Sequence, residues 1–546
     1  MTDNLIQRTA SAYSYPLIIK NMFYAPVVNN PEQEIVYRGE RRFSYQEFHK
    51  RVHRLAAGLT KLGVNPGDTV AMMDWDSHRY LECFYAVPML GAVLHTVNVR
   101  LSPEQIVFTI DHAEDDFILL NSEFLPLIEQ VKGRIDTVKE YILINDEETP
   151  PESPIAFAGE YEQLLAEASE TFEFKDFDEN TRATTFYTTG TTGLPKGVYF
   201  SHRQLVLHTL GTLTALATSA EQGRFHRNDV YMPITPMFHV HAWGFPYIAT
   251  TVGVKQVYPG KYIPKLLLHL IEKEKVTFSH CVPTILHMLM TCPEFKTIDL
   301  SSWKVVIGGA ALPKQMCKAA LDKGIDIFSG YGMSETCPVL TLAQVDSRDI
   351  GTDNEIDIRC KTGRPLPLVQ LRVVDEKMND VEGDGSSVGE IVVRSPWLTQ
   401  GYWKDSRNSE NLWNGGFLHT GDVANINNSN YVAITDRIKD VIKIGGEWLS
   451  SLELEDIINL HPAVSEVAVI GTGDAKWGEK PLALIVVRED ATEPEPKEMV
   501  GHVKSFIDKG LMSKLALLLE VKYVDQIDKT SVGKINKKVL RETFLK

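Results

Sequence analysis

Threonine, glycine and lysine crowd together in the stretch YTTGTTGLPKGV, which runs from Tyr187 to Val198. Glycine allows backbone amides to approach a phosphate closely, threonine hydroxyls donate hydrogen bonds to phosphate oxygens, and lysine adds positive charge. The order departs from the Walker A pattern G-x-x-x-x-G-K-[ST], because two residues separate Gly190 from Gly193 and because Gly197 follows Lys196. The stretch therefore predicts a phosphate-binding loop of a different class, and a flexible surface loop is the alternative.

The residues on either side of this stretch favour the phosphate loop. ATTFY, which precedes it, has the pattern of a β-strand, and Ser201 in SHRQLVLH is a suitable N-cap for a following helix. A polar loop between a strand and a helix directs backbone amides toward an anion. We therefore expect a strand, the loop and a helix in succession.

Together with this loop, six further segments resemble, in the expected order, the motifs of the adenylate-forming superfamily of acyl-CoA synthetases, luciferases and peptide-synthetase adenylation domains. They are TPMFHVHAW (Thr235 to Trp243), GGA (Gly308 to Ala310), SGYGMSET (Ser329 to Thr336), HTGD (His419 to Asp422), DRIKDVIKIGGEWLS (Asp436 to Ser450) and TSVGKINKKVL (Thr530 to Leu540). One matching segment could arise by chance, whereas this ordered set is specific and covers nearly the whole chain.

The resemblance implies a reaction in two steps. A carboxylate and ATP first give an acyl-adenylate and pyrophosphate, and the thiol of CoA then attacks the carbonyl while AMP leaves. Thr188 and Glu335 resemble the residues that contact Mg²⁺ in this family, and oxygen ligands combined with substrate phosphates are the usual magnesium environment. The β- and γ-phosphates would be held by Thr188, Thr189, Gly190, Thr191, Thr192, Gly193 and Lys196.

The same resemblance implies a nucleoside site. Asp422 would accept hydrogen bonds from the ribose hydroxyls with Arg437 assisting, and Tyr331 would stack on adenine. A turn residue, a surface ion pair and a core aromatic are the respective alternatives. The remaining residues of this site would be Gly308, Gly309, Ala310, Ser329, Gly330, Gly332, Met333 and Ser334.

Lys534 is the catalytic lysine that the resemblance implies, since GK after TSV matches the family motif at this position. Its charge would stabilise the transition state of adenylation, whereas a surface lysine is the alternative. The C-terminal domain would rotate about Lys439 between the two steps. Rotation would bring a second set of residues to the thiol tunnel, namely Gly445, Gly446, Glu447 and Trp448; helix-boundary glycines are the alternative there.

The acid-binding segment most resembles that of bacterial medium- and long-chain fatty acyl-CoA synthetases. In that subgroup an indole equivalent to Trp243 gates a fatty-acyl tunnel, and core packing is the alternative here. His239 would orient or shield the carboxylate, or else serve as a structural histidine. Aryl- and alicyclic-carboxylate ligases, the reverse ATP-forming direction and a non-catalytic nucleotide-binding scaffold stay open as alternatives.

The elements that must position these residues are of the α/β class. Helix-like and strand-like patterns alternate along most of the chain, including a helix capped by Ser44, and a turn-rich region of short strands starts near Arg364. VSEVAVIG and PLALIVV then predict strands of a final small unit. With the resemblance, we expect two helix-layered α/β sheets and a small barrel-like unit in residues 1–436, a hinge at 437–443, and a mobile α+β domain at 444–546.

Composition limits the class of protein further. A chain of 546 residues with 43% hydrophobic and 23% charged residues fits a multi-unit globular enzyme. The net charge of −16 argues against a nucleic-acid partner. The sequence shows no signal peptide and no apolar run that would span a bilayer, and its six cysteines lack CxxC pairs. We therefore expect a cytoplasmic enzyme without an integral membrane segment, and the resemblance implies a homodimer.

Overall fold

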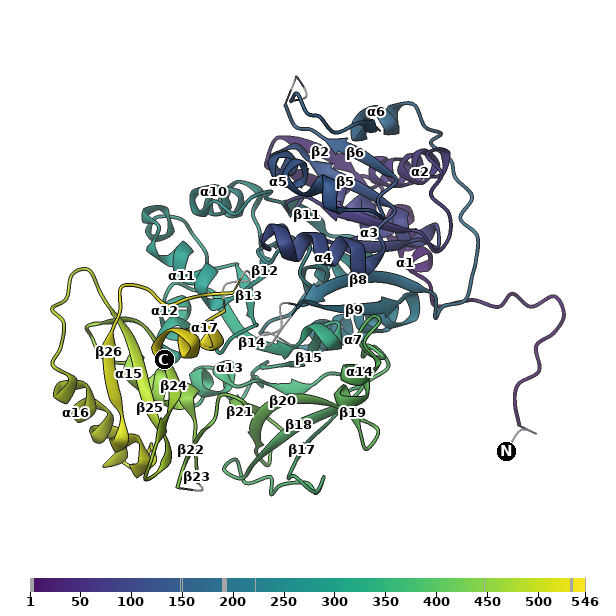
Figure 1. Ribbon diagram of the computed structural model, residues 1–546. Coiled ribbons are helices and arrows are strands. Elements are labelled where there is room, and N and C mark those ends of the chain that lie inside the picture. The colour runs from purple at the N-terminus through teal and green to yellow at the C-terminus, as the bar shows by residue number, and fades with distance from the viewer. Residues whose placement is uncertain are drawn as a thin grey trace.

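The computed structural model describes residues 4–147, 149, 151–188, 194–220, 222–445, 447–530 and 534–545, with Trp448 described by its backbone alone. Four β-sheets organise this part of the chain, and helices cover them (Figure 1). Three sheets form a body up to Arg437, and the fourth belongs to a smaller C-terminal unit. Within the described ranges, no helix is long and apolar enough to cross a bilayer.

The first sheet of the body has seven strands and is parallel except at its last strand. Its order is β7 (Phe157–Glu160), β6 (Glu140–Ile144), β5 (Phe117–Asn121), β3 (Thr69–Met73), β4 (Val93–Thr96), β8 (Arg182–Thr188) and β9 (Lys196–Ser201). The helices of this part of the chain are α2 (Tyr45–Lys61), α3 (His78–Met89), α4 (Pro103–Ala113), α5 (Leu125–Val131), α6 (Tyr161–Ala166) and α7 (His202–Thr218). β3, β4 and β5 are buried on both faces, which explains their continuous apolar runs.

The second sheet has nine strands, and its centre is parallel. Its order is β16 (Arg364–Pro365), β15 (Val339–Leu342), β14 (Asp326–Gly332), β13 (Lys304–Ile307), β12 (Phe278–Cys281), β10 (Val230–Pro233), β11 (Lys255–Tyr258), β1 (Glu34–Tyr37) and β2 (Arg41–Ser44). The accompanying helices are α1 (Ile19–Asn29), α8 (Val240–Trp243), α9 (Phe245–Val252), α10 (Pro264–Glu274), α11 (Pro283–Thr291), α12 (Lys314–Asp322) and α13 (Glu355–Cys360).

Two antiparallel-dominated sheets complete the fold, and the turn-rich sequence after Arg364 predicts the first of them. The third sheet holds β17 (Gln370–Val374), β18 (Val388–Arg394), β19 (Trp413–Asn414), β20 (Phe417–Ile426) and β21 (Val432–Arg437), with α14 (Ser406–Leu412) beside it. The fourth holds β22 (Ile442–Ile444), β23 (Glu447–Leu449), β24 (Val464–Asp474), β25 (Gly478–Val487) and β26 (Glu520–Tyr523), with α15 (Ser451–Asn459), α16 (Pro496–Ile507) and α17 (Lys537–Phe544).

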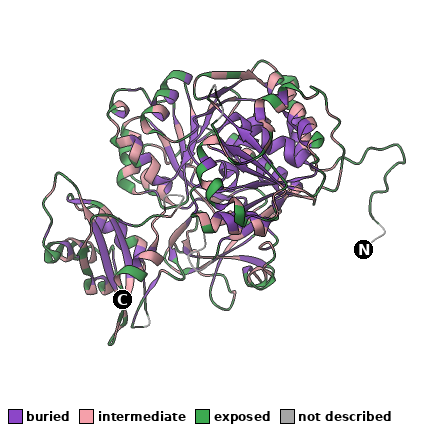
Figure 2. Cartoon of the chain, turned by 45° about the horizontal axis from the view of Figure 1, so that its top comes forward, coloured by how far each residue is buried: buried purple, intermediate pink, exposed green. Residues whose placement is uncertain are grey.

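Local sequence signals account for several of these boundaries. Ser44 accepts a hydrogen bond from the amide of Glu47 at the start of α2, and Ser201 forms a capping box with Gln204 at the start of α7. Both predicted caps are confirmed, as are the strands predicted in VSEVAVIG and PLALIVV. Buried residues concentrate in the sheets and on the inward faces of the helices (Figure 2).

Candidate functional site

The phosphate-loop stretch lies between two antiparallel strands. Thr188 ends β8, Lys196 begins β9, and these two residues are directly paired across the hairpin. Of the predicted loop residues, five lie outside the described part of the chain: Thr189, Gly190, Thr191, Thr192 and Gly193. The hairpin thus brings together the two ends of the predicted phosphate loop.

The expected strand–loop–helix order is wrong in one respect, because β9 intervenes between the loop and α7. The residues KGVYFS pair with β8 and run back along it until Ser201 lies opposite Arg182, at the far end of the hairpin from the loop. The N-terminus of α7 is therefore remote from the loop. Val198 and Phe200 are buried on β9 while Tyr199 and Ser201 are only partly buried, and this alternation explains why the stretch extends the sheet instead of starting the helix.

Tyr402 connects the phosphate hairpin to Glu335. Its hydroxyl donates a hydrogen bond of 2.7 Å to Oε1 of Glu335, a buried carboxylate, and its ring lies 4.5 Å from Nζ of Lys196. The backbone of Tyr402 also bridges to Val198 on β9. The sequence analysis missed Tyr402, since the contact joins residues far apart in the chain and an aromatic side chain after Gly401 carries no distinctive signal.

Strand ends of the nine-stranded sheet supply one wall of a large cavity. The cavity has a volume of about 1620 Å³ and lies between the body and the C-terminal unit. Ends of parallel strands are a common place for ligands in such sheets. Among the predicted nucleotide-site residues, those that line it are Gly309, Ala310, Ser329, Gly330, Tyr331, Gly332, Asp422 and Arg437. Met333 and Ser334 follow directly in the turn after β14.

Asp422 and Arg437 are brought together by the pairing of β20 with β21, where they lie directly opposite each other. Nε of Arg437 lies 3.1 Å from Oδ1 of Asp422, and the Tyr331 hydroxyl donates a 2.7 Å hydrogen bond to Oδ2. Each carboxylate oxygen can accept a further hydrogen bond. The arrangement therefore holds Asp422 in a fixed orientation with capacity left for a polar ligand.

Lys534 reaches this cavity from the C-terminal unit. A Cβ atom added at Gly309 would lie 3.1 Å from Cε of Lys534, so the glycine provides the space for the lysine stem. Burial and, to a smaller extent, the positive charge of Arg437 lower the pKa of Lys534 to about 8. The carboxylates of Asp422 and Glu335 oppose this shift. Lys534 thus lies among the predicted ribose and metal residues.

His239 lies close enough to Lys534 for the two side chains to interact electrostatically. Burial lowers the pKa of His239 to about 3, with smaller contributions from Lys534 and His241. A neutral imidazole can donate or accept a hydrogen bond at neutral pH but carries no charge. His239 of the acid segment therefore lies near Lys534, the predicted catalytic lysine.

Trp243 ends a segment with an unusual backbone. Val240, His241, Ala242 and Trp243 all have positive φ between 48° and 59°, so α8 is a left-handed turn. This conformation costs non-glycine residues about 1–2 kcal/mol each. The indole packs over Gly308, where an added Cβ would lie 2.9 Å from Cη2 of Trp243. Gly308 is thus part of the contact between the nucleotide strands and the acid segment.

The predicted hinge and thiol-tunnel residues lie in different surroundings. Lys439 lines the cavity and sits in the turn between β21 and β22, and the Lys439 carbonyl accepts a hydrogen bond from Arg541. Gly445 and Glu447 belong to the β22–β23 hairpin, and neither lines the cavity. Gly446 and the side chain of Trp448 lie outside the described residues.

Oxygen ligands are present for the predicted magnesium ion. Glu335 is a carboxylate whose orientation Tyr402 fixes, and Thr188 supplies a hydroxyl at the end of β8. The described residues contain no cluster of three or more His, Cys, Asp or Glu side chains suited to a metal. One carboxylate with substrate phosphates fits magnesium, which rarely occupies an all-protein cage.

Comparisons with known proteins identify relatives of the whole chain. The family model described as AMP-binding enzyme matches residues 23–403, and the AMP-binding enzyme C-terminal domain matches residues 453–534. A long-chain-fatty-acid–CoA ligase of Thermus thermophilus is 39% identical, over 92% of this chain and 90% of the relative. A 3-methylmercaptopropionyl-CoA ligase of Ruegeria lacuscaerulensis is 36% identical, over 92% of each chain.

A solved structure supports the same fold. The anthranilate CoA ligase AuaEII, in complex with anthranoyl-AMP, superposes with a TM-score of 0.84 and covers 97% of this chain and 98% of its own. At 23% identity this likeness concerns the fold alone. The two-part arrangement of a large body and a small C-terminal unit is therefore shared with known structures.

Proposed function

We propose that this chain, which belongs to the AMP-binding enzyme family, is an AMP-forming acid–CoA ligase. It converts a carboxylic acid and ATP to an acyl-adenylate and pyrophosphate, and then transfers the acyl group to CoA. The observation that carries this proposal is the approach of Lys534 to Gly309, beside Asp422 and Arg437. A separate unit carries this lysine into the predicted nucleotide cavity, and catalysis explains that arrangement better than nucleotide binding alone.

In the first step a carboxylate oxygen bonds to the α-phosphorus of ATP while the bond to the β-phosphate oxygen breaks. Both reactants are anions, so their approach requires positive charge. Lys534 would supply that charge at the carboxylate and the α-phosphate, and Lys196 would restrain the departing pyrophosphate. Neutral His239 would orient the acid without adding charge. Asp422 would hold the ribose, with Tyr331 and Arg437 fixing its carboxylate.

Magnesium would be held by Glu335 and the Thr188 hydroxyl together with phosphate oxygens. Bound there, the ion would neutralise negative charge on the phosphates. Tyr402 would keep one oxygen of Glu335 in place, and Lys196 would add its own charge nearby.

In the second step the sulfur of CoA bonds to the acyl carbon, and the bond from that carbon to AMP breaks. Lys534 must leave to admit the thiol, and we propose that the C-terminal unit rotates about Lys439. Gly445 and Glu447 are not among the residues that line the cavity, which supports this, because they would serve only after rotation. Domains of residues 1–436 and 444–546 with a hinge at 437–443 belong to the same proposal.

The acid is proposed to be a medium- or long-chain fatty acid. The Thermus relative is named for long-chain fatty acids. The indole of Trp243 packs on Gly308, and we propose that it gates an acyl tunnel. The Ruegeria relative is named for a short thioether acid, so chain length needs direct measurement. One methylene changes discrimination by about 1–3 kcal/mol.

Incubation with ATP, magnesium, CoA and a panel of fatty, aromatic, alicyclic and thioether acids tests the proposal. We expect AMP and thioester in equal amounts, with the highest kcat/KM for a fatty acid. No turnover of any acid would contradict the enzyme and favour a nucleotide-binding scaffold. Adenylate without thioester would contradict CoA as the acceptor. Running the assay with acyl-CoA, AMP and pyrophosphate measures the reverse direction.

The setting of the enzyme is also proposed. All six cysteines are free thiols, which agrees with a reducing cytoplasm. A homodimer is expected from the family resemblance. Sedimentation of the purified chain would test the oligomeric state.

A further inference from the structure

The acid segment from Met237 to Trp243 holds a backbone that needs external support. Four successive residues of this segment have left-handed conformations. Such conformations persist where the surrounding structure fixes them. Since His239 interacts with Lys534 and Trp243 packs on Gly308, the position of this segment determines how the acid would meet the lysine.

Asp76 provides one support from the seven-stranded sheet, in the loop after β3. Its Oδ1 accepts a 2.8 Å hydrogen bond from the amide of Met237, and its Oδ2 accepts a 2.5 Å hydrogen bond from the hydroxyl of Tyr262. Its carbonyl accepts from the amide of Gly260 at 2.8 Å. Only 3% of Asp76 is exposed, so the contacts exclude water.

Thr96 provides the second support, at the end of β4. Its hydroxyl donates a 2.9 Å hydrogen bond to the carbonyl of Phe238, and the side chain is buried. Two adjacent residues of the acid segment, Met237 and Phe238, are therefore held through their backbones by two strands of the other sheet. Backbone contacts of this kind do not depend on the side chains of the segment.

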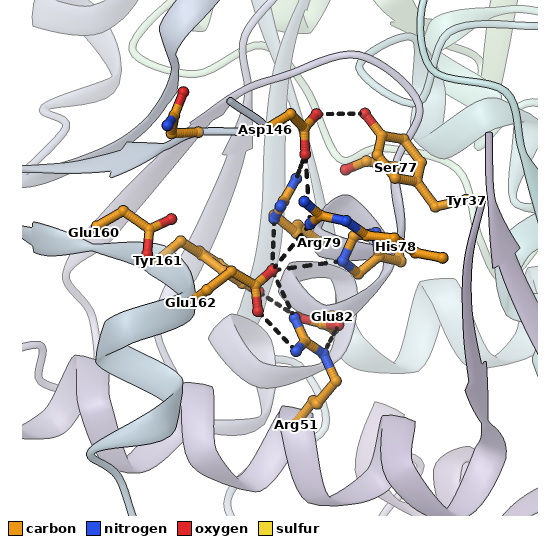
Figure 3. Close-up of polar contacts among 12 residues, drawn as sticks. Tyr37, Arg51, Ser77, His78, Arg79, Glu82, Asp146, Glu160, Tyr161 and Glu162 are labelled. Atoms are coloured by element: carbon orange, nitrogen blue, oxygen red, sulfur yellow. Dashed lines mark hydrogen bonds and ion pairs between the residues drawn. The ribbon is translucent and has the colours of Figure 1, made fainter. Parts of the chain in front are cut away.

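A charge network centred on the buried Arg79 lies next to the Asp76 end of this contact. The helix α3 begins directly after Ser77, whose side chain accepts from the amide of Tyr80. Arg79 then donates to Asp146 and to Glu162, each at 2.9 Å (Figure 3). Arg79 thus ties α3, the helix that follows the Asp76 loop, to α6 and to Asp146 just beyond β6, which gives the support a rigid base.

We propose that Asp76 and Thr96 are positioning residues that hold the segment Met237–Trp243 in register with Lys534. This proposal rests on the proposed acid–CoA ligase function for its effect on catalysis. A buried carboxylate is costly unless its oxygens are satisfied. Burial raises the pKa of Asp76 to about 7, and hydrogen bonds from Tyr262 and Met237 oppose that rise.

The substitutions D76A, D76N and T96V test this role. Alanine removes both acceptors, whereas asparagine can still accept from Met237 and pair with the Tyr262 hydroxyl. Valine keeps the shape of Thr96 and removes its donor. E82Q is the matched control, because Glu82 is a buried carboxylate on α3 that pairs with Arg51 and Tyr161 and not with the acid segment.

The first measurement is steady-state kinetics with acid and ATP varied separately. We expect D76A to raise KM for the acid about tenfold or lower kcat to a similar extent, and to leave KM for ATP within about twofold. D76N should restore most of the activity, and T96V should cause a smaller loss of the same kind. Equal increases in the KM values for acid and ATP would overturn the proposal. Failure of D76N to restore activity, or the same acid-specific loss in E82Q, would also overturn it.

The second measurement is hydrogen exchange of the peptide that contains Met237, and it requires no turnover. D76A and T96V should speed exchange in this peptide, whereas D76N and E82Q should leave its protection near that of the unmodified chain. Unchanged protection in both D76A and T96V would overturn the proposed support. A chain that activates no acid but shows the expected exchange would instead contradict the proposed function alone.

Discussion

The body and the C-terminal unit differ in how they hold their parts of the site. One hydrophobic cluster runs through the seven-stranded, nine-stranded and third sheets of the body. The C-terminal unit has two clusters of its own, both formed by residues from Ile442 onward. Among the described residues, polar contacts join the unit to the end of β21, such as the hydrogen bond from the Ser451 amide to Asp436.

We infer from this difference that the body binds the nucleotide, whereas the C-terminal unit carries Lys534 to the site. Asp422 and Glu335 belong to elements packed into the large core, so the predicted nucleotide- and metal-binding residues keep their positions. Lys534 belongs to a unit whose core is complete without the body. Polar contacts can be exchanged for water at a net cost of about 0.5–1.5 kcal/mol each, so the unit can move without unfolding. The predictions that follow test this division, beginning with the largest effect.

K534A should remove the lysine charge that the C-terminal unit carries to the site and leave nucleotide binding by the body intact. We expect adenylation to fall by about 10²–10³-fold, because the charge at the developing transition state is lost. Thioester formation from supplied acyl-adenylate should stay near the unmodified rate. Single-turnover assays of each step would measure the two rates. K538A, which removes a half-exposed lysine four residues further along the chain, is the control. Equal loss in both steps would contradict the division.

D422N should weaken nucleotide binding by the body. The amide weakens the ion pair with Arg437 and the hydrogen bond from Tyr331, and it offers a poorer acceptor to ribose. Hydrogen bonds to charged groups contribute about 1.5–3 kcal/mol, so kcat/KM for ATP should fall about 10–100-fold. ATP binding by calorimetry should weaken to match. Intact ATP affinity with impaired acid binding would show that Asp422 serves the acid side instead.

Raising the pH should reproduce the loss of Lys534 charge gradually. The pKa of this lysine is lowered to about 8, so the charged form is present below that pH and lost above it. The kcat/KM for adenylation reports the free enzyme and should fall about tenfold per pH unit on the alkaline side. Pyrophosphate exchange across the pH range would measure it. K534R should shift the alkaline limb upward, and an unshifted limb would assign it to another group.

Y402F should have the smallest effect, since it removes one hydroxyl that orients Glu335. A single hydrogen bond of about 0.5–1.5 kcal/mol corresponds to a loss of about 2–10-fold. We expect this loss as a higher magnesium requirement for adenylation, with thioester formation unaffected. Magnesium titrations at saturating ATP would measure it. An unchanged magnesium requirement would separate Tyr402 from the predicted metal residues.

Patterns of neighbouring residues in the sequence predicted much of the fold and of the candidate site. The caps at Ser44 and Ser201, the α/β alternation and the late antiparallel region follow from local periodicity and side-chain chemistry. The ordered motifs predicted which residues would meet, and Asp422 and Arg437 do lie opposite each other.

Contacts across long stretches of chain were not predictable in the same way. Tyr402 reaches Glu335, and Asp76 reaches Met237, only because separate sheets pack together. The left-handed turn at Val240–Trp243 contradicts the backbone preferences of its own residues, so no local rule predicts it. Strand β9 was not predicted, because the sequence analysis expected the helix capped by Ser201 to follow the phosphate loop directly.

The contact between Trp243 and Gly308 couples the two proposed substrate sites mechanically. An added Cβ at Gly308 would lie 2.9 Å from the indole and 3.0 Å from the carbonyl of Gly330. A tilt of the ring toward this wall would push on the strands that line the nucleotide cavity, and nucleotide bound there would resist that push. Redesign of the acid pocket at Trp243 therefore has to be assayed for ATP affinity as well as for chain length.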